Sequence, residues 1–389
     1  MQYLEEIEKY IGVIQKYDDV PNYFLNILRD IKKENSEKTP MKVGIIGDEF
    51  YGLYVRSYGL TPVFLKGGSY RMGENASHIF PQISDPIAKA AVGLLLDPEL
   101  NLVEELEAII ISASNDSFKK AMFYLKDLNL NIIQVEPPSY MFEKMPFKFI
   151  SKQLQLLNSI SKLTNTVFNI EALKTEIKGY QDAYALMASS KWQALPIFLQ
   201  SFFLQTLHMD EDKDFWLIEM EKYLSLKTET SNNNSDKFSL RLAGSEIHIP
   251  NSKFHEILFE VGITHYKDTC VGLVDFSKVK LNTNAFSLIK NCFAAYYNHL
   301  FTTKNINLTG QFNFLEDTQG IIFYLLKGQT TDSYTAERME EFALKADIPF
   351  LCIETDYTDT DKEQIRIRVE AFYEMLSGNL SKKPKLKVG

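Results

Sequence analysis

Short apolar runs that alternate with helix-length amphipathic segments restrict this chain to very few folds. In its first half the runs cover residues 42–46, 62–65, 108–111 and 132–135. Such runs are typical of strands buried on both faces, and alternation with the predicted helices 86–96 and 117–128 indicates a parallel sheet covered on both sides. Pro86 suits the first turn of one helix, and Asp116 is placed to cap the other.

The same pattern returns after residue 236. Strands are predicted at 238–244, 262–266, 320–325 and 349–354. The two halves can be laid over each other, because 107–117 matches 320–333 and 131–136 matches 350–354. This repetition indicates two related parallel-sheet domains of the flavodoxin- or Rossmann-like type. Ligands of such sheets bind beyond the carboxyl ends of the strands. The loops at those ends are 47–52, 66–73, 112–117, 136–140, 244–248, 267–272, 326–333 and 354–360.

The remaining sequence has helical spacing. Leu4, Ile7, Ile11 and Ile14 form one apolar stripe, which we expect to pack on a neighbouring domain or subunit. Apolar residues between 140 and 230 recur at helical intervals, and residues 231–236 form a polar loop. The predicted parts are an N-terminal helical segment 1–40, a first α/β domain 41–140, a helical insertion 141–236 and a second α/β domain 237–389.

Composition excludes several functions. The 42 basic and 51 acidic residues give a net charge of −9, which argues against nucleic-acid binding, because that needs a basic surface. No uncharged stretch reaches the roughly 20 residues that span a bilayer. The amino terminus lacks the basic start and apolar run of a secretion signal, and three unclustered cysteines suit a reducing compartment. We expect a cytoplasmic protein.

The last part of the chain carries the most specific motif. Residues 348–357 read Ile-Pro-Phe-Leu-Cys-Ile-Glu-Thr-Asp-Tyr, and residues 364–372 read Gln-Ile-Arg-Ile-Arg-Val-Glu-Ala-Phe. Together they resemble the family of 2-hydroxyacyl-CoA dehydratases and benzoyl-CoA reductases. Residues 59–63 look like its Gly-x-x-Pro-Val, residues 116–120 like the end of its Cys-Asp-Ser-x-Lys-Lys, and residues 262–272 like its Gly-Ala…Asp-x-Cys-x-Gly. The resemblance covers roughly residues 40–376 and fits a D-component-like subunit.

The resemblance implies a specific chemistry. Family subunits have two α/β domains each and pair with a homologous subunit. Cysteines at strand ends hold an iron–sulfur cluster, and a separate ATP-dependent activator supplies one electron. The substrate is an acyl-CoA whose thioester carbonyl accepts that electron, so the activity is that of a lyase or an acyl-CoA reductase.

This chain departs from the family at the cluster. Of the three ligand positions that the resemblance implies, only Cys270 keeps a cysteine. The first position is Asn115, and the third falls near Gly328 or Gln329. Amide oxygens do not replace thiolates for iron–sulfur chemistry. Cys270 is thus the one metal-ligand candidate, either a vestigial ligand or a functional thiol, and we expect a four-iron cluster only with ligands from a partner. Cys292 and Cys352 are interpreted as buried small apolar residues.

Candidates for catalysis and substrate binding are few. The family commonly has a Pro-Glu-Glu segment just before its Gly-x-x-Pro-Val, but that stretch reads Tyr51-Gly52-Leu53 here. Asp48 and Glu49 lie nearby but out of register, so no catalytic residue is assigned. The basic loop that runs from Lys66 to Arg71 is a candidate for a CoA phosphate or a solvated loop, and Ser114 is a further substrate-loop candidate.

Three functional hypotheses follow. The first is a working subunit that binds acyl-CoA in a complex whose cluster lies in a homologous subunit. The second is a divergent, cluster-free member that binds a metabolite. The third is a scaffold or interaction protein, which the N-terminal helix and the helical insertion suggest. The first two are favoured jointly.

Overall fold

Two four-stranded parallel sheets form the framework of the protein. The structure, a computed structural model, describes residues 2–32, 40–81, 83–137, 147–227, 239–268, 273–303 and 318–382. The first sheet has the order β2-β1-β3-β4 and the second β6-β5-β7-β8. The strands are β1 Lys42–Ile46, β2 Thr61–Phe64, β3 Leu106–Ser112, β4 Ile132–Val135, β5 Leu240–Gly244, β6 Lys267–Asp268, β7 Gly320–Leu326 and β8 Phe350–Thr355. This identical order confirms the predicted pair of related α/β units.

The apolar runs form strands because helices cover both faces of each sheet. Every residue of β7 is buried, and β3 is buried except at Glu107. We call β1–β4 with their helices the first domain, and β5–β8 with theirs the second. The helices of the first are α3 Gly52–Ser57, α4 Tyr70–Asn75, α5 Pro86–Leu95, α6 Leu102–Glu105 and α7 Asp116–Asp127, with the 3-10 turn η2 Glu49–Tyr51. Those of the second are α13 Lys253–Val261, α15 Thr330–Lys345 and α16 Lys362–Lys382.

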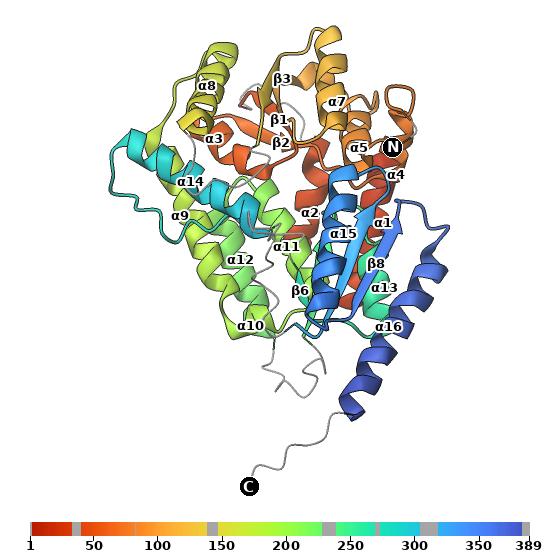
Figure 1. Cartoon of the computed structure of the whole chain (residues 1–389). Coiled ribbons are helices and arrows are strands. Elements are labelled where there is room, and N and C mark those ends of the chain that lie inside the picture. Colours follow the sequence, from red (N-terminus) through yellow and green to blue (C-terminus); the bar gives the residue numbers. More distant parts are fainter. Residues whose placement is uncertain are drawn as a thin grey trace.

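Helix α14 (Ala285–Thr303) follows the second domain's β6 in sequence but packs against the first. The ring of Tyr296 stacks on Phe50 with centroids 4.1 Å apart, and Phe293 stacks on Tyr54 at 4.9 Å. Figure 1 shows this cyan helix beside α8, far from β8 at the other side of the molecule. The crossing of α14 places Tyr296 where the two domains meet.

Helices fill the space beside the two domains. They are α1 Gln2–Tyr17, α2 Asn22–Arg29, the 3-10 turn η1 Asp30–Lys32, α8 Phe147–Thr164, α9 Ile170–Met187, α10 Ser190–Gln193, α11 Ile197–Met209 and α12 Lys213–Leu226. The predicted stripe on α1 is buried at Ile7, Ile11 and Ile14. The ring of Phe24 on α2 packs on Phe203 of α11 with centroids 4.9 Å apart, and Figure 1 shows the two helices side by side. The N-terminal helices therefore pack within their own chain.

Two local predictions were wrong. Residues 262–266 do not form a strand, because Gly262 at φ +92° ends α13 and β6 begins only at Lys267. The cap of α7 is Asn115, whose Oδ1 accepts a hydrogen bond from the amide of Phe118; Asp116 is already helical, and its side chain faces solvent. The loop 231–236 and Cys270 lie outside the described residues, and the domain boundaries at 140 and 236 stay predictions. Within the described ranges no helix is long and apolar enough to cross a membrane.

Lys253 fixes the segment that carries the family-like motif. Its buried Nζ lies within hydrogen-bond distance of four oxygens: Thr355 Oγ1 at 2.7 Å, the Asp356 carbonyl at 2.6 Å, the Thr358 carbonyl at 2.7 Å and Asp361 Oδ1 at 2.9 Å. One ammonium thereby joins the start of α13 to the whole turn between β8 and α16.

The substitution Lys253→Met tests this role. It leaves Asp361 without its buried cation, so we expect the free energy of unfolding to fall by about 3 kcal/mol in denaturant titration. The control is Lys327→Met, which removes an exposed lysine that pairs with Asp356 at 3.2 Å and should cost about 0.5 kcal/mol or less. Equal losses from both variants would contradict the assignment.

Candidate functional site

The carboxyl ends of the two sheets face each other across a narrow gap bridged by loops. A Cβ on Gly68, after β2, would lie 2.0 Å from the carbonyl oxygen of His248, after β5. A Cβ on Gly328, after β7, would lie 2.5 Å from the carbonyl oxygen of Ser84, and the φ of Gly328 is +97°. Only glycine allows these approaches. We call the region between these loops the interdomain site; it comprises Asp48, Glu49, Lys66, Asp85, Ser112, Asn115, His208, His248, Tyr296 and Gln329.

A buried ion pair forms one side of the interdomain site. Glu49 begins the turn after β1, Lys66 follows the end of β2, and the two strands are neighbours. The Lys66 ammonium donates to Glu49 Oε1. Burial is the largest single influence and would raise the pKa of Glu49, but the charge and hydrogen bond of Lys66, together with His208 and His248, hold that pKa well below its usual range. The Glu49 side chain is 23% exposed, so this pair is not closed to solvent.

The adjacent carboxyl group is shifted in the opposite direction. Ser112 Oγ, at the end of β3, donates a hydrogen bond of 2.6 Å to Asp48 Oδ2. Burial raises the pKa of Asp48, and the charge of Glu246 adds to the effect. Asp48 and Glu49 are thus consecutive carboxyl groups whose environments move their pKa values apart. Opposite pKa shifts of neighbouring carboxyl groups are typical of sites in which one group holds a proton and the other stays charged.

A neutral histidine lies behind the ion pair. Burial lowers the pKa of His208, on α11, to about 3. Its Nδ1 is 3.2 Å from the hydroxyl of Tyr180, and its carbonyl accepts a 2.8 Å hydrogen bond from Arg56. Burial also lowers the pKa of Lys213 to about 8. At neutral pH the imidazole therefore contributes no charge to oppose Lys66.

The two positions that the family resemblance assigned to lost cluster ligands converge on one carboxylate. Asn115 Nδ2 donates to Asp85 Oδ2 at 2.6 Å, and Gln329 Nε2 donates to Asp85 Oδ1 at 3.2 Å. Asn115 stands between β3 and α7, and Gln329 stands between β7 and α15. The residues therefore occupy equivalent places in the two domains, as the overlay of the two halves predicts.

These residues do not fit a four-iron cluster. The iron ions of such clusters take thiolates, whereas this set offers a carboxylate already bonded to two amides. Burial raises the pKa of Cys292 to about 12 and also raises that of Cys352, which lies within β8, so neither favours the thiolate form. In the part of the chain that the structure describes, no three His, Cys, Asp or Glu side chains gather in a metal-binding group.

The substrate-loop candidates separate in the structure. Lys66 belongs to the interdomain site. Arg71 lies on the exposed side of α4, where its Nη1 donates to Glu5 at 2.5 Å, and Ser114 is exposed. Sequence reasoning did not select Asp85, which reads as an ordinary helix cap before Pro86. It set Asp48 and Glu49 aside for their register, although both fall in the predicted loop 47–52.

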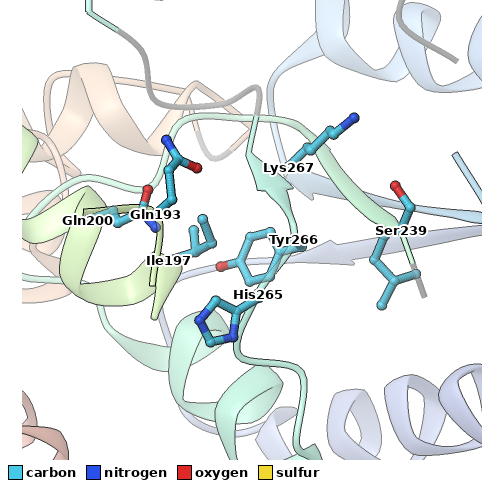
Figure 2. Close-up of a pocket in the computed structure, with 8 residues that line it drawn as sticks. Gln193, Ile197, Gln200, Ser239, His265, Tyr266 and Lys267 are labelled. Carbon is cyan, nitrogen blue, oxygen red and sulfur yellow. The ribbon is translucent and has the colours of Figure 1, made fainter. Parts of the chain in front are cut away.

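A separate pocket of about 210 Å³ lies at the opposite, amino-terminal end of the second sheet. Figure 2 shows Gln193, Ile197 and Gln200 on one side of it and Tyr266, Lys267 and Ser239 on the other. His265 is hydrogen-bonded through both ring nitrogens, to Thr264 Oγ1 at 2.8 Å and to the Ala194 carbonyl at 3.2 Å. The pocket is smaller than typical ligand sites, and it lies at the end of the sheet that ligands avoid.

Comparison with known families decides the relationship. The sequence model of the family 2-hydroxyglutaryl-CoA dehydratase, D-component, matches residues 54–376, well over half of the 389 residues. The chain belongs to this family. The match includes Lys66, Asp85, Asn115 and Gln329, while Asp48 and Glu49 precede it. No curated protein matches the chain.

The buried imidazole gives a testable pH dependence. The folded pKa of His208 is about 3, below the usual 6.5, so between these values the unfolded chain binds one more proton there. This group therefore lowers the unfolding free energy by about 1.4 kcal/mol for each unit that pH falls. We expect His208→Gln to make the plot of unfolding free energy against pH shallower by about that slope between pH 4 and 6.

Denaturant titrations at several pH values measure this slope. His78→Gln, which replaces an exposed histidine, should leave the slope of the wild-type protein unchanged. An unchanged slope in His208→Gln would show that the buried imidazole does not control acid stability.

Proposed function

We propose that the chain is a subunit of a dehydratase- or reductase-type complex that binds an acyl-CoA thioester at its interdomain site, without a complete cluster of its own. The observation that carries this proposal is the arrangement of Lys66, Glu49 and Asp48. A buried cation and two carboxyl groups with opposite pKa shifts lie where two parallel sheets present their carboxyl ends to each other. That is the usual ligand position of such sheets.

The chemistry of these groups suits a thioester carbonyl. Lys66 is a fixed positive charge in a largely water-excluded place, where it stabilises negative charge on a carbonyl oxygen more than it would in water. Asp48, with its raised pKa, is suited to hold a proton and donate it to such an oxygen. Ser112 orients the Asp48 carboxyl group.

The complex follows from the family rather than from the geometry. A D-component is, by its name, one component of a larger enzyme, and a homologous subunit is the natural partner. The redox centre of the complex would then lie in that subunit, which an ATP-dependent activator would serve. The alternative is a cluster-free relative that binds a metabolite or serves as a scaffold.

Thermal-shift measurements with short-chain acyl-CoA thioesters test the binding proposal. At a hundredfold excess over Kd, a ligand adds about 2.7 kcal/mol, which raises the Tm of a chain of this length by roughly 3 °C. The double substitution Glu49→Gln with Lys66→Met removes both charges together and should abolish the shift. Lys327→Met, an exposed control, should keep it.

The absence of a saturable shift with any thioester would contradict the proposed function and favour the scaffold alternative. If free CoA gave the same shift as the thioesters, the protein would recognise the nucleotide part of CoA and not the acyl group. Co-expression with a cysteine-complete homologue, followed by size-exclusion chromatography, tests the complex separately. Failure to co-elute would count against a homologous partner.

A further inference from the structure

We infer that Asp85, Asn115 and Gln329 form a latch that joins the two domains at the position where the family resemblance places an iron–sulfur cluster. At this position the chain does more than lack cysteines: hydrogen bonds among these three side chains take the place of the cluster in joining the domains. The inference concerns the protein without ligand and does not depend on acyl-CoA binding.

The orientation of the Asn115 amide is fixed by a second hydrogen bond. Asn115 Oδ1 accepts from the amide of Phe118 at 3.1 Å, so its Nδ2 must face Asp85. Asp85 Oδ1 accepts from the amide of Ile87 at 2.9 Å as well as from Gln329. The amide of Asp85 in turn donates to Ser117 Oγ at 3.0 Å. The carboxylate is therefore held by its own helix and reaches both domains with the same two oxygens.

The latch is buried and backed by a close approach of the backbone. Asp85 is 2% exposed, and hydrogen bonds to a carboxylate are stronger in such surroundings than in water. Gly328 brings the loop after β7 against Ser84, the residue before Asp85. Side-chain and backbone contacts thus join the same two loops, one from each domain.

The latch also explains why the donor set does not suit iron. The Asp85 carboxylate occupies the space between Asn115 and Gln329 and uses both their amide groups as donors. Removal of Asp85 together with introduction of thiols at 115 and 329 should therefore restore the set of three cysteines that the family resemblance implies, at positions 115, 270 and 329. This reversal is a direct test of the inference.

Hydrogen exchange measured by mass spectrometry tests the latch itself. Asp85→Ala should accelerate exchange by about tenfold or more, the loss expected for a charged hydrogen bond, in segments 83–95 and 326–337 alike. Asp85→Asn keeps the helix cap, because its side-chain oxygen still accepts from Ile87, but it presents an amino group to one of the two donors. The new amino group takes the place of Oδ2 and meets the Asn115 amino group, so this variant should accelerate exchange at the start of α7, and leave α5 protected.

The control is Asp116→Ala, which removes an exposed carboxylate next to Asn115 and should change neither segment. Asp85 acting only as a helix cap predicts a different result: Asp85→Ala would accelerate 83–95 alone, and Asp85→Asn would match the wild type. Either of these outcomes would overturn the latch.

Iron and sulfide analysis after anaerobic reconstitution tests the replacement. The triple variant Asp85→Ala, Asn115→Cys, Gln329→Cys should gain iron and sulfide in equal amounts and absorb near 400 nm, whereas the wild type should not. A full four-iron content in the wild type would overturn the inference, as would an iron-free triple variant whose circular dichroism shows that it is folded. Neither measurement uses a thioester, so this outcome is distinguishable from failure of the proposed function.

Discussion

A parallel sheet places the carboxyl ends of all its strands at one edge, and in this protein two such edges face each other. The chain that follows each strand in this gap must turn and enter a helix within a few residues. This explains the glycines at 68 and 328, where the loops of opposite domains approach too closely for a side chain. It also explains why polar groups from β1, β2, β3, β5 and β7 meet in one place. Strand direction alone brings the residues of the interdomain site together, and their side-chain chemistry then decides what the site can do.

Burial in this gap forces every charged group to find a partner, and the partners then set the chemistry. Lys66 keeps Glu49 ionised, while Asp48, with a hydroxyl instead of a cation beside it, has a raised pKa. The same demand operates at Asp85, whose carboxylate is satisfied by amides from two domains. One physical requirement thus produces two different results: consecutive carboxyl groups with opposite pKa shifts, and a buried carboxylate hydrogen-bonded to both domains.

The fold was predictable because its central strands β1, β3, β5 and β7 are almost fully buried, which makes them continuous apolar runs in the sequence. The exception, 262–266, failed because Gly262 serves as a helix end, a role that an apolar neighbourhood does not reveal. The site was less predictable. The sequence singled out positions 115 and 329 but not their contact with Asp85. Gln329 and Asp85 are 244 residues apart, so no local pattern reveals that they meet. Glu49 was set aside for its register in a linear comparison, although its side chain meets Lys66 from the next strand.

Under the family resemblance, the position between the two domains has two separate tasks, which are to hold a redox cofactor and to keep two strand-end loops together. The first task needs thiolates, and only the second can be done by amides and a carboxylate. Because Asp85 also caps α5 through Ile87, it belongs to a rigid helix start and needs only two amides opposite it to complete the link. Asn115 and Gln329 stand where the resemblance implies thiols, and through Asp85 they still join the two domains. Under the proposed function, such a subunit keeps the geometry of an acyl-binding side while a partner supplies the electron chemistry.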